Sequence, residues 1–276
     1  MKDIKFSVSM CVYGKDNPKW FRVAVESILD QTCPPNEVVL VVDGPVPDEL
    51  GTVINEYEKN PVFKVIRLAE NQGHGNARRT GLENCSNELV AIMDSDDISV
   101  PERFEQQIKM FESDPSIDII GGNIAEFVGE IDNFVGKRIV PCSDLEIKDY
   151  MKYRCPMNLV TVMFKKSSVY AAGGFIDWFC EEDYYLWLRM YLKKMKFANI
   201  PDVLVNVRVG KEMYQRRGGW KYFKSEAKLQ KYMFDNKVIK FPTYFINCSK
   251  RFVVQVMLPN RIRGWVFKKF ARKDTK

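Results

Sequence analysis

Apolar residues along the first hundred positions follow two different patterns. Short, nearly continuous apolar runs, which are typical of buried strands in a parallel sheet, occur at 6–13, 37–42, 62–68 and 89–93. Between these runs, apolar residues recur at helical spacing and predict helices at 18–31, 50–57 and 75–85. Asn17 and Pro18 are typical of a cap and a first helical turn. Strands and helices that alternate with short connections indicate βαβ units around a parallel sheet.

The second half of the chain is less regular. We expect a helix at 102–111, short strands at 117–120, 124–128 and 160–165, a helix at 182–194 and a last strand at 203–209. The segment 132–148 is polar and irregular, and we expect a mobile loop there. Two further helices are predicted, at 220–234 and 251–270. The sequence therefore predicts an α/β domain at 1–210 and a helical C-terminal extension at 211–276.

Length and composition exclude several classes of protein. The 276-residue chain shows no signal-peptide pattern, and no apolar run approaches the roughly 18 residues that span a bilayer. Seven scattered cysteines without a Cys-x-x-Cys pair favour reduced thiols in a cytosolic protein over disulfides or a zinc site. The single histidine, His74, excludes histidine-based triads and histidine-rich metal sites.

Charge is distributed unevenly between the two parts of the chain. Residues 208–276 carry 19 Lys and Arg against 4 Asp and Glu, whereas the preceding part is acidic. A basic tail suggests an anionic partner such as phospholipid or nucleic acid. Aromatic residues interspersed with the basic ones suit an interfacial helix on anionic lipid. The alternative is an ordinary solvated helix that covers the domain.

Acidic residues follow the strand predicted at 89–93. Asp94 and Asp96 are two residues apart, so on an extended backbone they point to the same side, and Asp97 points away. Ligands of open α/β sheets bind at the carboxyl ends of the strands. Paired carboxylates there favour Mg²⁺ or Mn²⁺, which usually arrives with the phosphates of a substrate. The alternative is a solvated acidic turn.

Two other segments are expected at the same edge. Asp43 ends the second strand before Gly44 and should share a crevice with Asp94, although a cap or turn residue gives the same pattern. The segment 71–79 joins the third strand to a helix. Its glycines let the backbone approach a ligand, and its arginines favour a phosphate or a nucleobase carbonyl.

A third acidic cluster lies far along the chain. Glu182 and Asp183 begin a predicted helix shortly after a Gly-Gly-Phe segment at 173–175. Carboxylates in a first helical turn are stabilised by the helix dipole, which is a sufficient structural reason for them. The functional interpretation is a general base that accepts the proton of a substrate hydroxyl.

In this order and at these separations, the segments resemble family 2 of the glycosyltransferases over about residues 6–209. The matching segments are 6–13 (opening strand), 41–44 (Asp-Asp-Gly), 71–78 (Asn-x-Gly-x-x-x-Ala-Arg), 93–97 (Asp-x-Asp-Asp), 173–175 (Gly-Gly-Phe) and 182–189 (Glu-Asp). Members of this family are inverting enzymes that use nucleotide sugars. They have a GT-A fold, in which helices flank a mainly parallel, Rossmann-like sheet.

The resemblance implies a role for each matching residue. The base of the nucleotide would be held by Asp43 and Arg78, with Val12 and Tyr13 lining the same pocket. Asp94 would contact the ribose or the metal, Asp96 would ligate Mn²⁺ or Mg²⁺, Glu182 would contact substrate, and Asp183 would be the general base. The donor would be UDP-linked and the acceptor a hydroxyl of a glycan or of a lipid-linked saccharide, as in assembly of bacterial surface polysaccharides. We expect a cytoplasmic enzyme, peripheral on the inner face of the cytoplasmic membrane through its extension, and no nucleic acid partner.

Three positions depart from the family pattern. Gly14 replaces an asparagine, Val42 replaces the first acid of Asp-Asp-Gly, and 208–210 lacks the histidine of Arg-x-His. Lys211, Arg216 or Arg217 are the candidates to supply the missing positive charge.

Two other functions share part of this pattern. A nucleotidyltransferase that makes the activated sugar also needs a metal and a nucleotide, but no glycine-rich basic loop follows the first strand. A non-catalytic nucleotide-sugar-binding protein is disfavoured because Asp94, Asp96 and Asp183 are all present.

Overall fold

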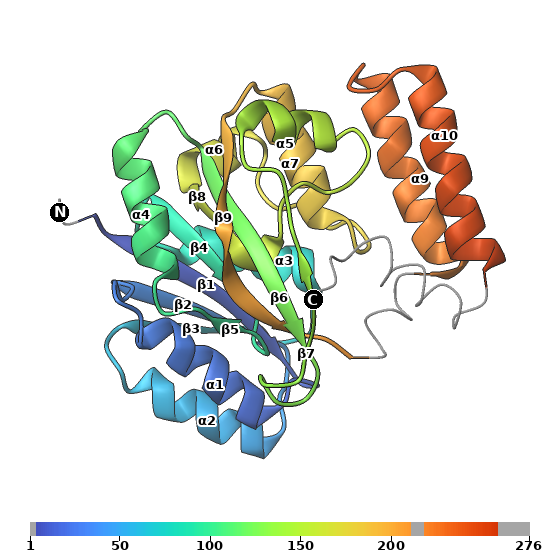
Figure 1. Ribbon diagram of the computed structural model, residues 1–276. Helices are drawn as coiled ribbons and strands as arrows, with labels where there is room; N and C mark the ends of the chain where they lie inside the picture. The colour runs from blue at the N-terminus through green and yellow to red at the C-terminus, as the bar shows by residue number, and fades with distance from the viewer. Residues whose placement is uncertain (1–3, 211–217, 259–276) are drawn as a thin grey trace.

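The computed structural model describes residues 4–210 and 218–258, which form a nine-stranded sheet flanked by helices (Figure 1). The strands are β1 (Phe6–Tyr13), β2 (Glu37–Asp43), β3 (Phe63–Arg67), β4 (Leu89–Met93), β5 (Ile98–Ser99), β6 (Ile119–Phe127), β7 (Phe134–Arg138), β8 (Met163–Lys165) and β9 (Phe197–Arg208). The α-helices are α1 (Pro18–Leu29), α2 (Asp48–Glu58), α3 (His74–Asn84), α4 (Arg103–Ser113), α5 (Asp144–Tyr150), α6 (Lys166–Ala171), α7 (Glu182–Leu192), α9 (Gly219–Asp235) and α10 (Phe241–Phe252). A 3₁₀ turn (Leu159–Thr161) precedes β8, and a π-helical turn (Val253–Met257) follows α10.

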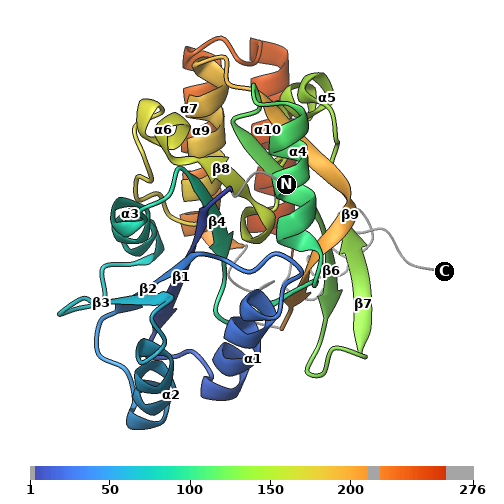
Figure 2. The same ribbon diagram turned by 90° about the vertical axis from the view of Figure 1, so that its left-hand side faces the viewer.

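The strand order is β3-β2-β1-β4-β8-β6-β9-β5, with β7 paired to β6. The first four strands are parallel to one another. The short strand β8 is antiparallel to both of its neighbours and joins β4 to β6. Figure 2 shows β6, β7 and β9 on the opposite side of the sheet from β2 and β3. The carboxyl ends of β1, β2 and β4 therefore lie together at one edge.

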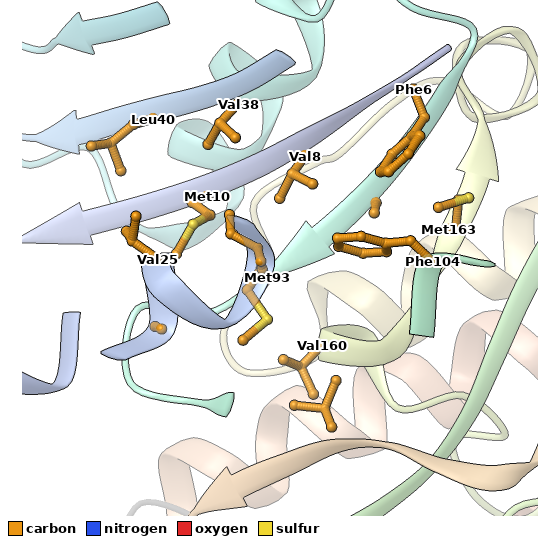
Figure 3. Close-up of a cluster of buried hydrophobic side chains, with 14 of the residues drawn as sticks. Phe6, Val8, Met10, Val25, Val38, Leu40, Met93, Phe104, Val160 and Met163 are labelled. Carbon is orange, nitrogen blue, oxygen red and sulfur yellow. The ribbon is translucent and has the colours of Figure 1, made fainter. Parts of the chain in front are cut away.

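The central strands β2 and β4 are buried on both faces and are almost entirely apolar. On β2, Val38 and Leu40 belong to a cluster with α1, α2 and α4, whereas Val39 and Val41 belong to a second cluster with α3 and α7. Figure 3 shows part of the first cluster, in which Phe6 and Phe104 are within ring contact at 5.0 Å between centroids. This burial explains why these strands are continuous apolar runs rather than alternating ones.

The helical extension shares the second cluster. Leu229 and Met233 of α9 are fully buried there, together with side chains of α7. Figure 1 shows α9 and α10 as an antiparallel pair at one side of the molecule. The helix predicted at 220–234 is confirmed, and the division of the chain at residue 210 stays a prediction.

The predicted loop at 132–148 is wrong, because β7 and α5 lie within it. Ser143 and Glu146 form a reciprocal capping box at the start of α5: the Glu146 backbone N–H donates to the Ser143 hydroxyl at 3.4 Å, and the Ser143 backbone N–H donates to the Glu146 carboxylate at 3.2 Å. The first part of the segment 132–148 is held in a regular strand by the pairing of β7 with β6.

Three other boundaries differ from the sequence prediction. The runs predicted at 117–120 and 124–128 form one strand, β6, which continues through Gly121 and Gly122. Neighbouring side chains approach closely there: a Cβ on Gly121 would lie 2.5 Å from Asn199 Oδ1, and a Cβ on Gly122 would lie 2.6 Å from Leu204. Strand β9 begins at Phe197 rather than at 203. The helix predicted at 251–270 is wrong at its start, since α10 ends at Phe252, and residues 259–276 lie outside the described residues.

Two predictions about class are consistent with the described residues. All seven cysteines fall within them, and none is joined in a disulfide. Within 4–210 and 218–258, no helix has the length and apolar character needed to cross a membrane.

Candidate functional site

A cleft of about 300 Å³ opens at the carboxyl ends of β1, β2 and β4. Six of the residues predicted from the sequence line it: Val12, Tyr13, Asp43, Arg78, Asp94 and Asp96. We call this space the strand-edge cleft. The parallel topology thus brings together residues that are up to 84 positions apart in the sequence, as expected for an open α/β sheet.

A wider cavity of about 560 Å³ adjoins the strand-edge cleft, and Arg78 and Asp94 line both spaces. Glu182 and Asp183, the other two predicted residues, line this wider cavity. One part of its wall is aromatic and consists of Trp178, Phe179 and, from the C-terminal helix α9, Tyr222. All eight predicted residues therefore border two connected spaces.

Asp43 fixes the loop that follows β3. Its two carboxylate oxygens accept hydrogen bonds from the backbone N–H of Gln72 at 2.7 Å and of Gly73 at 3.1 Å. Gly44 follows with φ +86°, and a Cβ at this position would lie 2.6 Å from the backbone nitrogen of Asn71. The Asp-Gly pair is thus needed for the close approach of the loop, and each carboxylate oxygen keeps further acceptor capacity.

Arg78 joins the two sides of the site. Its guanidinium donates to Glu182 Oε1 at 2.5 Å and to Asp94 Oδ1 at 3.2 Å. Burial opposes the charge of Arg78, but the Asp94 and Glu182 carboxylates outweigh it and raise the pKa of the guanidinium. Arg78 is therefore a fixed cation between the end of β4 and the start of α7.

Carboxylates are crowded around the turn after β4. Asp16 accepts a hydrogen bond from the Ser95 hydroxyl at 2.8 Å and another from the backbone N–H of Tyr13 at 3.0 Å. Burial, together with the charges of Asp94 and Asp16, raises the pKa of Asp96 to about 6. This part of the cleft thus has an excess of negative charge that a cation would relieve.

Arg208 holds the same turn from β9. Its backbone N–H donates to Asp97 at 2.8 Å, and its Nε donates to the Asp96 carbonyl at 3.1 Å. The guanidinium lies over the rings of Trp20 and Phe127, at 4.5 and 4.6 Å from their centroids. Asp97 is therefore turned toward β9. Lys211, Arg216 and Arg217, the three residues predicted to supply the missing positive charge, lie outside the described residues.

Asp183 lies in the first turn of α7 and is half-buried. Burial, followed by the charge of Glu182, raises the pKa of the Asp183 carboxyl to about 6. The backbone N–H of Tyr184 donates to it at 2.6 Å and opposes the shift. An aspartate with this pKa is ionised at neutral pH and is still basic enough to accept a proton.

The Gly-Gly-Phe segment positions the loop before α7. Gly173 and Gly174 both have positive φ, and Arg189 donates to the carbonyls that flank this turn, at 2.6 Å (Ala172) and 2.7 Å (Gly174). Arg79 of α3 donates to the Phe175 carbonyl at 2.9 Å. The glycines therefore shape the turn, and two arginines attach it to the helices on either side.

Helix α9 supports the aromatic wall of the wider cavity. The Ser225 hydroxyl donates to the Phe179 carbonyl at 2.6 Å, and the Trp178 indole N–H donates to the Ser225 carbonyl at 3.4 Å. Trp178 also packs on Tyr185 of α7, with 4.4 Å between ring centroids. The extension is thus part of the site, which the sequence analysis did not foresee.

Asp16 and Tyr222 are two of the lining residues that were not predicted from the sequence. Asp16 follows β1, and the rule that ligands lie at strand ends would have identified it. Tyr222 carries no such signal, because it reaches the cavity only through the packing of α9 against 178–179.

Within 4–210 and 218–258, no group of three or more His, Cys, Asp or Glu side chains is arranged to hold a metal ion. Such a group is not required for Mg²⁺ or Mn²⁺ that binds with a nucleotide, since one or two carboxylates suffice and phosphates and water complete the shell. Asp94 and Asp96 border the same cleft, and the charge of Asp94 adds to the negative potential at Asp96. The two carboxylates therefore fit this requirement.

Comparison with known proteins agrees with this geometry. The model of the family described as "Glycosyl transferase family 2" matches residues 7–179. The amylovoran biosynthesis glycosyltransferase AmsE of Erwinia amylovora is 35% identical over 96% of this chain and 98% of its own length. A protein of Escherichia coli named UDP-Gal:alpha-D-GlcNAc-diphosphoundecaprenol beta-1,3-galactosyltransferase is 36% identical over 98% of this chain and 97% of its own length.

A solved structure shows the same fold. The mannosyltransferase PcManGT of Pyrobaculum calidifontis, in complex with GDP-Man and Mn²⁺, superposes with a TM-score of 0.63 at 15% identity. The match covers 94% of this chain and 71% of that one. The predicted GT-A fold, with a mainly parallel sheet and C-terminal helices, is confirmed.

Proposed function

Because this chain belongs to glycosyl transferase family 2 and is a glycosyltransferase, we propose that it transfers a sugar from a UDP-linked donor with inversion at the anomeric carbon. The acceptor is a hydroxyl of a glycan or of a lipid-linked saccharide. The observation that carries the proposal is the connection of the two spaces: Asp96 lines the strand-edge cleft, Asp183 lines the wider cavity, and Arg78 lines both.

The strand-edge cleft is proposed to bind the nucleotide. Asp43 accepts hydrogen bonds from the base, and the backbone at Val12 and Tyr13 lines the base pocket. Arg78, already held by Asp94 and Glu182, presents a fixed positive charge at the passage to the wider cavity. The E. coli relative is named for a UDP-linked donor, which supports the choice of UDP.

Asp96, with Asp94 beside it, is proposed to hold Mn²⁺ or Mg²⁺. The ion would neutralise the charge of the departing diphosphate. The negative potential that raises the pKa of Asp96 supports this assignment, as does the Mn²⁺ bound with GDP-Man in PcManGT.

Asp183 is proposed to be the general base. Its carboxylate accepts the proton of the acceptor hydroxyl while that oxygen attacks the anomeric carbon from the face opposite the leaving group. The bond to the diphosphate breaks as the new glycosidic bond forms, so a single displacement inverts the configuration. Glu182 is proposed to contact substrate, and its ion pair with Arg78 fixes its orientation.

A panel of nucleotide sugars with Mn²⁺ or Mg²⁺ tests the proposal. We expect hydrolysis or transfer with at least one UDP-linked sugar, and a product of inverted anomeric configuration by NMR. A product of retained configuration would exclude the single displacement, and turnover of none of the donors would exclude the enzyme function proposed here.

Replacing Asp96 with alanine should abolish the effect of Mn²⁺ on UDP affinity. Loss of a charged ligand to the ion should weaken binding in the presence of Mn²⁺ by roughly 10- to 100-fold and leave binding in EDTA unchanged. Calorimetric titration with UDP, with Mn²⁺ and with EDTA, measures both quantities. Asp202→Ala, an exposed position on β9, is the control. The same gain from Mn²⁺ in Asp96→Ala and wild type would refute the metal role.

We also propose that α10 rests on an anionic membrane, which suits a lipid-linked acceptor. Apolar side chains exposed on α10 and on the turn after it include Phe241, Phe245 and Met257, which are 60, 61 and 63% exposed. Lys240, which precedes Phe241, and Lys250 are also exposed. Exposed aromatic residues next to lysines are typical of a helix at the surface of anionic lipid.

Replacing Phe241 and Phe245 with serine should weaken binding to phosphatidylglycerol-containing vesicles by roughly tenfold or more, since each buried aromatic side chain contributes about 1.5–3 kcal/mol. Co-sedimentation measures the bound fraction. The matched control is Val23→Ser with Leu192→Ser, which are exposed on α1 and α7. Undiminished sedimentation of the α10 variant would exclude α10 as the membrane contact.

A further inference from the structure

The passage between the strand-edge cleft and the wider cavity has a defined set of walls. Four of the described residues line both spaces: Gly73, His74, Arg78 and Asp94. In the transfer proposed above, the nucleotide lies in the first space and the acceptor hydroxyl in the second. The bond between the anomeric carbon and the diphosphate therefore breaks at this passage. His74 lies there without a role in the reaction as proposed above.

The backbone on either side of His74 is held in place. Gly73, with φ +83°, donates its N–H to the Asp43 carboxylate at 3.1 Å. Gly75 is buried, and a Cβ at this position would lie 2.8 Å from the Asp177 Cα, so the segment before α7 packs directly against the first turn of α3. The main chain at His74 is thus fixed from both sides, whereas the residue itself is exposed at the passage.

The imidazole of His74 keeps its hydrogen-bonding capacity for a ligand. Its ring lies edge-on to the Tyr13 ring, with 6.2 Å between centroids. Within 4–210 and 218–258, no residue forms a hydrogen bond with the ring nitrogens. Since an imidazole carries at least one N–H in either of its protonation states, His74 can donate to a group that enters the passage.

The charge of Arg78 is already compensated at this place. Its single guanidinium is shared by the carboxylates of Asp94 and Glu182. Arg208 lies over two aromatic rings and does not line either space. A diphosphate that leaves through the passage gains negative charge, so a further donor there would stabilise it. The position of His74 meets this requirement.

We propose that His74 donates a hydrogen bond to the β-phosphate of the donor and stabilises the diphosphate as it leaves. This inference rests on the function proposed above and adds a residue that touches the leaving group. As the acceptor oxygen bonds to the anomeric carbon, the electron pair of the breaking bond goes to an oxygen of the β-phosphate, and the acceptor proton goes to Asp183. The hydrogen bond from His74 is therefore stronger in the transition state than in the bound donor.

Calorimetric titration with UDP and with UMP tests this assignment, because the two ligands differ in the β-phosphate. We expect His74→Ala to weaken UDP binding roughly tenfold or more, through loss of a hydrogen bond to a charged group, and to change UMP affinity by less than about twofold. The loss for UDP should be the same with Mn²⁺ and with EDTA, since the contact does not pass through the ion. In steady-state transfer, kcat should fall roughly 10- to 100-fold. Glu83→Ala is the control, an exposed position near the other end of α3 that lines neither space.

Three outcomes would overturn the role of His74 and leave the proposed function standing. The first is wild-type UDP affinity and kcat in His74→Ala. The second is an equal loss of affinity for UDP and UMP, which would mean that His74 supports the base pocket or the fold. The third is a loss of UDP affinity confined to Mn²⁺, which would make His74 a ligand of the ion. Absence of UDP binding by the wild type would instead refute the proposed donor, and the role of His74 with it.

Discussion

Replacing Asp183 with asparagine should lower kcat by roughly 10²–10⁴-fold, because the amide cannot accept the proton of the acceptor hydroxyl. The dissociation constant for UDP should change by less than about twofold, since Asp183 lines the wider cavity and not the strand-edge cleft. Steady-state transfer and calorimetric titration measure the two quantities. Asp177→Asn, at an exposed position on the same cavity, is the matched control and should retain most of its activity. Full turnover by Asp183→Asn would eliminate the assignment.

The pH profile is an independent control on the same residue. The base must be ionised, so a pKa raised to about 6 means that activity is present above pH 6 and lost below it, about tenfold per unit. Saturating donor and Mn²⁺ keep Asp96, whose pKa is also about 6 in the free protein, in its ionised form. The slope should vanish in Asp183→Asn. A wild-type profile that stays flat down to pH 5 would contradict the proposed base.

Replacing Arg78 with methionine should lower the free energy of unfolding by about 3 kcal/mol at pH 7, because Glu182 and Asp94 lose their shared cation. This loss in the free energy of unfolding is at the lower end of the range for a broken buried ion pair, since the Asp94 side chain is 40% exposed and water can solvate it. Urea denaturation measures the change.

An exposed pair in the same protein provides the comparison for Arg78. Arg22→Met removes the ion pair with Glu56, whose side chains are 41 and 47% exposed, and should cost much less stability than Arg78→Met, because water and salt screen an exposed pair. The double variant Arg78→Met with Glu182→Gln should be more stable than Arg78→Met alone, because the second substitution removes the Glu182 carboxylate that the first leaves buried and unpaired. Equal losses for Arg78→Met and Arg22→Met would show that the buried bridge does not stabilise the fold.

The first half of the fold could be predicted from local sequence because β1, β2 and β4 are buried on both faces. The runs at 38–42 and 89–93 are uninterrupted apolar segments that are followed by aspartates, so both the strand and its functional end can be recognised. The parallel topology then places the ends together. For this reason the strand-edge cleft could be assembled from Asp43, Asp94 and Asp96 without coordinates.

The second half depends on contacts that leave no local pattern. Strand β9 passes through Pro201, where its pairing with β6 shifts register, and Asn123 donates to the Pro201 carbonyl at 2.5 Å. A proline at such an irregularity is compatible with a strand, but the sequence alone favours a break. Likewise, Tyr222 reaches the wider cavity only because α9 packs against 178–179.

The three-residue strand β8 has a consequence for synthesis on the ribosome. The parallel half of the sheet ends at β4, whose open edge has no partner until β8 emerges about 70 residues later, roughly 4–14 s at typical elongation rates. The nucleotide-binding half is therefore complete in sequence while its exposed edge still favours aggregation. The segment that closes this edge is followed by α6 and then by α7, which carries Asp183. A nascent chain stopped before β8 would thus lack the proposed base and leave the donor half exposed to self-association.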